Sequence, residues 1–209
     1  MSPERFLARP RRTLLLACAV LLLVLIWAFV VPAGTRTVDR HWWEWMEDTW
    51  SSAPGHAARF LAWLGNGYGR GLVVALLALP LLARRRWLGL AALGAVEVLT
   101  PLTTASLKAL SGQARPPHRL VSTHGSSFPS GHTSYAAATL VALVLLYSAP
   151  GPRRRLWWGL AALGVAAMAW SRTYLHAHWL SDVVAGGAWG WALALAVFAV
   201  AQLAASSAR

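Results

Sequence analysis

The sequence predicts an all-α membrane protein: a six-span transmembrane helical bundle with its N- and C-termini in the cytoplasm. Composition is the first observation, since 57% of the 209 residues are hydrophobic and 12% are charged. A soluble domain carries about 25% charged residues, roughly twice as many. The second observation is that the apolar residues form blocks near the roughly 18 residues that suggest a membrane span. We interpret residues 1–209 as one domain.

Six apolar blocks are the expected spans. The first follows a basic N-terminus and is longer than the apolar region of about 7–15 residues in a secretory signal. This favours an uncleaved signal anchor, although Ala33-Gly34 leaves cleavage open. The predicted spans are residues 14–31, 64–83, 87–109, 133–149, 156–174 and 183–204.

The orientation of the bundle follows from three arginine clusters between the apolar blocks. A net charge of +12 is also typical of nucleic-acid-binding proteins, but clustering between spans is the pattern of cytoplasmic loops. Six spans place all three clusters on one side, so we expect a multi-pass inner-membrane protein with no nucleic-acid partner. The clusters are Arg9, Arg11 and Arg12, then Arg84 to Arg86, and Arg153 to Arg155.

The segment after the first block is rich in tryptophan, with Trp42, Trp43, Trp45 and Trp50. Tryptophan favours the membrane–water boundary, where an apolar ring can keep its N–H hydrated. We interpret this segment as an interfacial helix. A lid over a lipid-binding cleft is the alternative.

Ionisable residues outside the arginine clusters gather at the other, non-cytoplasmic end. Ionisable groups at membrane depth are costly and usually functional. We therefore expect one site there, built from three short segments. Its candidate residues are Lys108, Arg115, His132, Arg172, His178 and Asp182.

The segment "FPSGHTSY" contributes the start of a helix. Ser130 is a favourable N-cap, and Gly131 allows a ligand to approach the backbone closely. The unpaired N–H groups of a first helical turn suit a phosphate, beside which His132 would stand. A simple helix cap with an incidental histidine is the alternative.

The segment "SRTYLHAHWLSD" contributes a histidine and a carboxylate four residues apart. On a helix, His178 and Asp182 would share a face and hydrogen-bond. A carboxylate on one ring nitrogen leaves the other more basic, as a nucleophile or general base requires. Arg172 adds a fork for phosphate oxygens. A purely structural His–Asp pair is the alternative.

The segment "KALSGQARPP" contributes two cations, Lys108 and Arg115. Phosphoryl groups are commonly held by both residue types. Snorkelling of basic side chains to the membrane interface is the alternative for each.

Together the three segments resemble the type 2 phosphatidic acid phosphatase superfamily, whose signature is K-x6-R-P, then P-S-G-H, then S-R-x5-H-x3-D. Here they read "KALSGQARP", "PSGH" and "SRTYLHAHWLSD", in order, between residues 108 and 182. The resemblance implies a metal-independent lipid phosphatase with no cofactor. Its site would lie on the extracytoplasmic side of the membrane.

The resemblance also implies a role for each site residue. His178 would attack phosphorus and form a phosphohistidine, with Asp182 orienting it, and His132 would protonate the leaving oxygen and then activate water. The phosphoryl oxygens would be held by Lys108, Arg115, Arg172, the Ser130 side chain and the Gly131 amide.

The sequence predicts the class of substrate but not the individual lipid. We expect a lipid monophosphate or diphosphate: phosphatidic acid, phosphatidylglycerol phosphate or an isoprenyl diphosphate. Phosphotransfer to a lipid or sugar, or anion or lipid transport, is the alternative. No feature predicts the oligomeric state. Outside the motifs, His176 is expected to gate or support the site, and Glu97 to pair with Lys108 or Arg70. Contact with the substrate head group is an alternative to a plain loop position for His118, Arg119 and His124.

Overall fold

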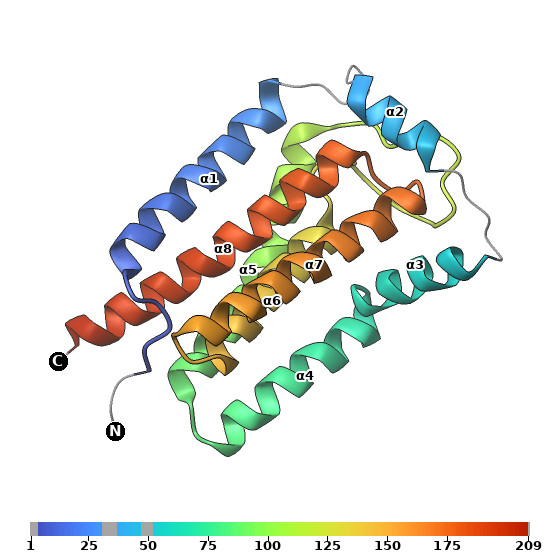
Figure 1. The fold of residues 1–209 in the computed structure, drawn as a ribbon. Helices are drawn as coiled ribbons and strands as arrows, with labels where there is room; N and C mark the ends of the chain where they lie inside the picture. Colours follow the sequence, from blue (N-terminus) through green and yellow to red (C-terminus); the bar gives the residue numbers. More distant parts are fainter. Residues whose placement is uncertain (1–3, 31–36, 47–51, 209) are drawn as a thin grey trace.

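The computed structural model is helical throughout and describes residues 4–30, 37–46 and 52–208 (Figure 1). The predictions for Val31, Ala33-Gly34 and Trp50 lie outside these residues. The helices of the described part are α1 (Pro10–Val30), α2 (Thr37–Trp45), α3 (Ala53–Leu64), α4 (Gly67–Ala83), α5 (Trp87–Ser111), α6 (Gly131–Tyr147), α7 (Pro152–Tyr174) and α8 (Leu180–Ser207).

A helix occupies each of the six predicted spans, but not all are long and apolar enough to cross a membrane. In the described part, α1, α5 and α8 meet that description, and the bent pair α3–α4 adds a fourth span if it is counted as one. The molecule is therefore an all-α membrane protein with three to four candidate spans. The second block contains a 64° bend between α3 and α4, because Gly65 ends α3 and Asn66 precedes α4.

Helix α6 is the central helix of the bundle. Its 17 residues span about 25 Å at 1.5 Å per residue, and it packs against α5, α7 and α8. Most of its residues are buried. An apolar helix that is buried all round belongs to a core, so α6 places its first turn inside the protein.

Two glycines bring the start of α6 against α8. A Cβ atom added at Gly186 would lie 2.5 Å from the carbonyl oxygen of Ser130, and one at Gly190 would overlap the backbone of Ser134. Any larger residue would push the two helices apart. The close contact brings the "PSGH" segment beside the first turn of α8.

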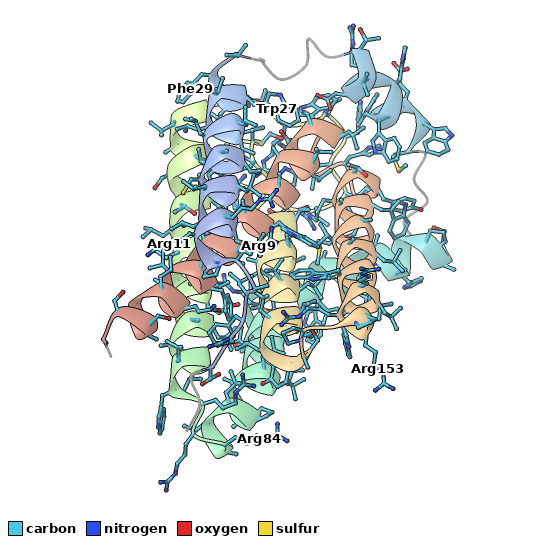
Figure 2. The ribbon with its side chains drawn as sticks, turned by 60° about the vertical axis from the view of Figure 1, so that its left-hand side comes forward. Arg9, Arg11, Trp27, Phe29, Arg84 and Arg153 are labelled. Carbon is cyan, nitrogen blue, oxygen red and sulfur yellow. The ribbon has the colours of Figure 1, made fainter. Side chains whose placement is uncertain are left out.

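Two of the arginine clusters lie at one end of the bundle, and Arg9 and Arg11 lie between the two ends in Figure 2. Figure 2 shows Arg84 and Arg153 at one end and Trp27 and Phe29 at the other. At the arginine end, the backbone N–H of Phe6 donates to Gln202 of α8 at 2.8 Å. The first described residues and the last turns of α8 therefore lie side by side.

Helix α2 lies across the other end of the bundle, as Figure 1 shows. Its Asp39 is buried and accepts hydrogen bonds from the N–H and hydroxyl of Ser181 at 2.8 and 2.7 Å. The Trp43 ring packs against His176 and His118. A helix is therefore present at Trp42, Trp43 and Trp45 and is attached to the start of α8, while its position at the membrane interface stays a prediction.

Candidate functional site

The end of α5 positions Lys108. Gly112 adopts a φ of +58°, in the left-handed region that glycine tolerates, and its N–H donates to the Lys108 carbonyl to end the helix. The Lys108 ammonium donates to the carbonyls of Ser126 and Ser127 at 2.7 and 3.2 Å. It therefore points into the loop 112–130.

The start of α6 is capped as the sequence predicts. The Ser130 hydroxyl accepts from the Thr133 N–H at 3.5 Å and hydrogen-bonds to the Thr133 hydroxyl at 3.0 Å. The Ser130 N–H donates to the Asp182 carbonyl at 3.0 Å. A Cβ atom at Gly131 would meet only a methyl group of Thr104, at 3.8 Å. Packing alone therefore does not require glycine at position 131.

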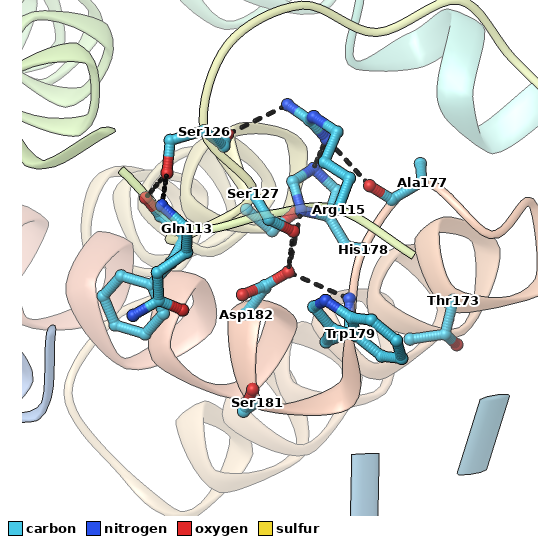
Figure 3. A network of polar contacts seen from close by, with 12 residues as sticks. Gln113, Arg115, Ser126, Ser127, Thr173, Ala177, His178, Trp179, Ser181 and Asp182 are labelled. Atoms are coloured by element: carbon cyan, nitrogen blue, oxygen red, sulfur yellow. Dashed lines mark hydrogen bonds and ion pairs between the residues drawn. The ribbon is translucent and has the colours of Figure 1, made fainter. Parts of the chain in front are cut away.

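His178 and Asp182 meet, although not on one helix. Helix α8 begins at Leu180, so the prediction that both residues share a helical face is wrong: His178 lies in the turn before it. Asp182 reaches back because it caps that first turn, accepting from the Trp179 N–H at 2.9 Å. The same oxygen, Oδ2, lies 3.4 Å from His178 Nδ1 and accepts from the Ser127 hydroxyl (Figure 3).

Arg115 connects the loop to the turn that carries His178. Its guanidinium donates to the carbonyls of Gly125, His124 and Ser126, all within 3.1 Å, and to that of Ala177 at 2.8 Å. Nη1 also lies 3.3 Å from His178 Nε2, the ring nitrogen that faces away from Asp182 (Figure 3). Arg115 therefore fixes the loop and provides positive charge where a phosphate on Nε2 would lie.

The electrostatic environment keeps His178 neutral. Burial lowers the pKa of His178 well below its ordinary value of 6.5, and the positive charges of Lys108, Arg172 and Arg115 lower it further. Burial also lowers the pKa of Arg115. A neutral imidazole with Nδ1 toward a carboxylate has its lone pair on Nε2, the state a nucleophile requires.

Arg172 and His132 are the remaining candidate site residues, and each has an unpaired side-chain nitrogen within the described part of the chain. Arg172 is 3% exposed. Neither its Nε nor Nε2 of His132 has a hydrogen-bond partner within the described residues. The His132 ring also hydrogen-bonds to the backbone of Ala62 at the end of α3. Both groups therefore keep unused donor or acceptor capacity beside His178.

The comparisons with known proteins decide the family. A model described as "PAP2 superfamily" matches residues 89–205. The chain belongs to the PAP2 superfamily. It is a PAP2-type lipid phosphatase, a phosphoric monoester hydrolase, in the membrane. No curated protein matches the chain significantly.

The fold of this PAP2 phosphatase is similar to a solved structure described as the first transmembrane PAP2 type phosphatidylglycerolphosphate phosphatase from Bacillus subtilis. The match has a TM-score of 0.69 at 19% sequence identity, and it covers 97% of this chain and 98% of the other. At that identity the likeness concerns the fold.

The residues that sequence analysis set outside the motifs occupy distinct places. Glu97 accepts from Arg70 at 3.2 Å, which matches one of the two expected pairings. His176 Nε2 lies 2.8 Å from the carbonyl oxygen of Met46, the residue that directly follows α2. His118 stacks on Trp43 at 6.4 Å between ring centroids.

Arg119 lines a cavity of about 630 Å³ next to Arg115. His124 supplies only a backbone carbonyl to Arg115 among the contacts described above. Neither side chain is therefore tied into the site by those contacts, and a role in head-group binding stays a prediction for both.

Two residues of the PAP2 site were missed by sequence analysis. Ser127 is fully buried and donates to Asp182, and Asp39 binds the N–H of the neighbouring Ser181. These pairs are 55 and 142 residues apart in the chain. The one available signal was Asp39, an acidic residue in the first turn of a helix that carries three tryptophans.

Proposed function

We propose that this protein hydrolyses a lipid phosphomonoester or diphosphate through a phosphohistidine on His178. The arrangement of the His178 ring is the observation that carries the proposal: Nδ1 faces Asp182 Oδ2 at 3.4 Å, and Nε2 faces Arg115 Nη1 at 3.3 Å. One nitrogen is thus oriented by a carboxylate, and the other meets a cation suited to a phosphoryl oxygen.

In the first step, the lone pair of His178 Nε2 attacks phosphorus and forms a P–N bond. The bond from phosphorus to the lipid oxygen breaks, and protonated His132 gives its proton to that oxygen. Burial and the charge of Arg172 lower the pKa of His132 to about 3, so its protonated form depends on the negative charge of the bound phosphate. Asp182 stabilises the positive charge on the His178 ring. Lys108 and Arg172 offset the charge that accumulates on the phosphoryl oxygens.

In the second step, the now neutral His132 takes a proton from water, whose oxygen attacks phosphorus. The P–N bond breaks, and phosphate leaves with His178 restored. The N–H groups of the first α6 turn, beginning with Gly131, face the same phosphate. The free space at Gly131 supports this role, because packing alone does not account for a glycine there.

The substrate class includes phosphatidic acid, phosphatidylglycerol phosphate and isoprenyl diphosphates. The structurally similar Bacillus subtilis protein is described as a phosphatidylglycerolphosphate phosphatase, which makes that lipid the first to test. Phosphate release from a panel of these lipids, in excess chelator, tests the proposal. We expect His178→Ala to lower the rate by at least about 10³-fold. A folded wild-type protein that is silent on every lipid would contradict it.

We also propose six spans, with both termini in the cytoplasm and the site at the outer leaflet. The arginine clusters lie between the proposed spans and support this orientation through the positive-inside rule. Cys18 is the only cysteine, so it can be replaced and single cysteines added at Ser122 and Ser207. In intact cells a membrane-impermeant maleimide should label position 122 and not position 207; the reverse pattern would invert the topology.

A further inference from the structure

A cavity of about 260 Å³ lies beside the proposed site, lined by residues of α4, α5 and α6. Lys108, Gly131 and His132 of the site line it, and so do Thr104 and Arg70, which have no role in the steps above. The cavity therefore extends from the proposed phosphate position on the His132 side.

Thr104 has a hydroxyl with no hydrogen-bond partner within the described residues, although it is only 4% exposed. One turn earlier on α5, the Thr100 hydroxyl donates to the Val96 carbonyl at 2.7 Å, the usual solution for a threonine inside a helix. A buried polar group without a partner costs free energy. Together with His132 Nε2, Thr104 gives this cavity two unpaired polar atoms.

Arg70 brings a fixed guanidinium to the same cavity. It lies 4.4 Å from the ring centroid of Tyr135, another lining residue. The Glu97 carboxylate accepts from Arg70 Nε at 3.4 Å and from Arg70 Nη2 at 3.2 Å. The Glu97 carbonyl also accepts from Arg70 Nη2, at 2.7 Å. The contacts with Glu97 do not use Nη1, so Arg70 can donate from Nη1 to a ligand oxygen without leaving Glu97.

We propose that this cavity binds the leaving alcohol of a glycerolipid phosphate, with Thr104 and Arg70 as its hydrogen-bonding residues. The proposal rests on the role of His132 above, since the group that protonates the leaving oxygen must lie on the alcohol side. Arg70 donates to an ester or hydroxyl oxygen of the glycerol unit, and Thr104 binds an oxygen nearer the phosphate. An isoprenyl chain has no oxygen beyond its phosphates and makes neither contact.

The test compares two lipid monophosphates, dioleoyl phosphatidic acid and a polyprenyl phosphate, by the kcat/KM of phosphate release. Thr104→Val removes the hydroxyl at constant shape, and we expect about tenfold loss on phosphatidic acid. The double variant Arg70→Gln with Glu97→Gln removes both charges, so that no buried carboxylate is left alone. Its expected loss on phosphatidic acid is about 10- to 100-fold. On polyprenyl phosphate, both variants should stay within about threefold of wild type.

Thr100→Val is the matched control: Thr100 lines the same cavity and lies on the same helix, but its hydroxyl already donates to the Val96 carbonyl. Its rates should stay within about twofold of wild type on both lipids. Equal losses on the two lipids, or no loss on phosphatidic acid, would overturn the subsite. A wild-type protein active only on the polyprenyl lipid would overturn it too. Silence of the wild-type protein on these two lipids and on the rest of the panel above would instead overturn the proposed function.

Discussion

The two sides of the proposed phosphate position are organised differently. On the nucleophile side, Asp182 Oδ2 contacts three groups at once, and Arg115 binds four carbonyls beside His178. On the leaving-group side, His132 Nε2 and Thr104 Oγ1 have no partner within the described residues and line a cavity. His178 and Arg115 are thus fixed in advance, while His132 and Thr104 keep free capacity for the ligand.

The difference has a physical reason. Charge that develops on a phosphoryl group is stabilised best by groups already oriented, because reorientation during the reaction costs free energy. Arg115 and Asp182 are therefore held by the backbone around them. On the alcohol side, the protein must donate a proton to the leaving oxygen and accommodate a variable lipid. Unpaired groups next to a cavity suit that task.

The largest effect that separates the two sides is expected from the leaving group itself. His132→Ala should lower hydrolysis of an alkyl phosphate by about 10²- to 10⁴-fold, because the poor leaving oxygen then departs without a proton. With 4-nitrophenyl phosphate, whose phenolate leaves unprotonated, the first step should be affected much less. His178→Ala should remove activity toward both substrates.

Single-turnover kinetics with both substrates would measure this contrast, since it isolates formation of the phosphoenzyme from its hydrolysis. If His132→Ala slowed that first step equally for the alkyl and the aryl phosphate, His132 would not be the residue that protonates the leaving oxygen.

A smaller effect is expected from the bend between α3 and α4. A Cβ atom at Gly65 would lie 2.5 Å from Cδ2 of the His132 ring, so Gly65→Ala must displace that ring or the bend. A displacement of about 1 Å can cost on the order of 10²-fold in rate, and we expect about 10- to 100-fold lower kcat.

Gly67→Ala is the matched control, because a Cβ atom there meets nothing within 4 Å. Assays of the two alanine variants under identical conditions would decide the point. Similar rates for both would show that the contact between Gly65 and His132 does not position the ring.

This contact illustrates what the sequence could and could not predict. The spacing of polar residues was enough to choose the candidates at one end of the bundle, because each motif is local in the chain. The apolar block at 64–83 hid the bend, since a helix C-cap and a helix start in adjacent residues do not interrupt hydrophobicity. His178 and Asp182 suggested one helix because four-residue spacing fits a helix and a capped turn alike.

Asp39 tests whether contacts from outside the motifs matter to the nucleophile side. It accepts from the N–H and hydroxyl of Ser181, next to Asp182. Asp39→Ala should lower kcat by about tenfold with KM little changed, because the first turn of α8 loses its support. Asp39→Asn can still accept from the N–H and should recover most of the rate.

The control for Asp39 is Glu44→Ala on the same helix, since Glu44 is exposed. Its kcat should match that of wild type. A loss in Glu44→Ala equal to that in Asp39→Ala would assign the effect to docking of α2 as a whole, and not to the contact with Ser181.

The smallest effect concerns pH and again distinguishes the two sides. Burial and three cations lower the pKa of His178 well below 6.5, so the nucleophile loses its lone pair only in more acidic solution. The limb of the kcat/KM profile that reports His178 should therefore lie below pH 6.5. Arg115→Gln removes one of these charges, raises the pKa of His178, and should move that limb to higher pH.

The thermal stability of the protein should also depend on the protonation of His178. The unfolded chain protonates this histidine near pH 6.5 while the folded protein resists, so thermal stability should fall as the pH drops below that value. Arg115→Gln should make this dependence shallower, because its His178 protonates more easily in the folded state.

Comparing variant and wild type on one substrate cancels the ionisation of the lipid phosphate. Arg119→Gln removes a charge from the same loop that is not among those lowering the pKa of His178, and its acid limb should stay in place. If Arg115→Gln leaves the acid limb in place while Arg119→Gln moves it, the charge that lowers the pKa of His178 comes from Arg119 and not from Arg115. The fixed contacts around His178 would then hold the turn without setting its protonation.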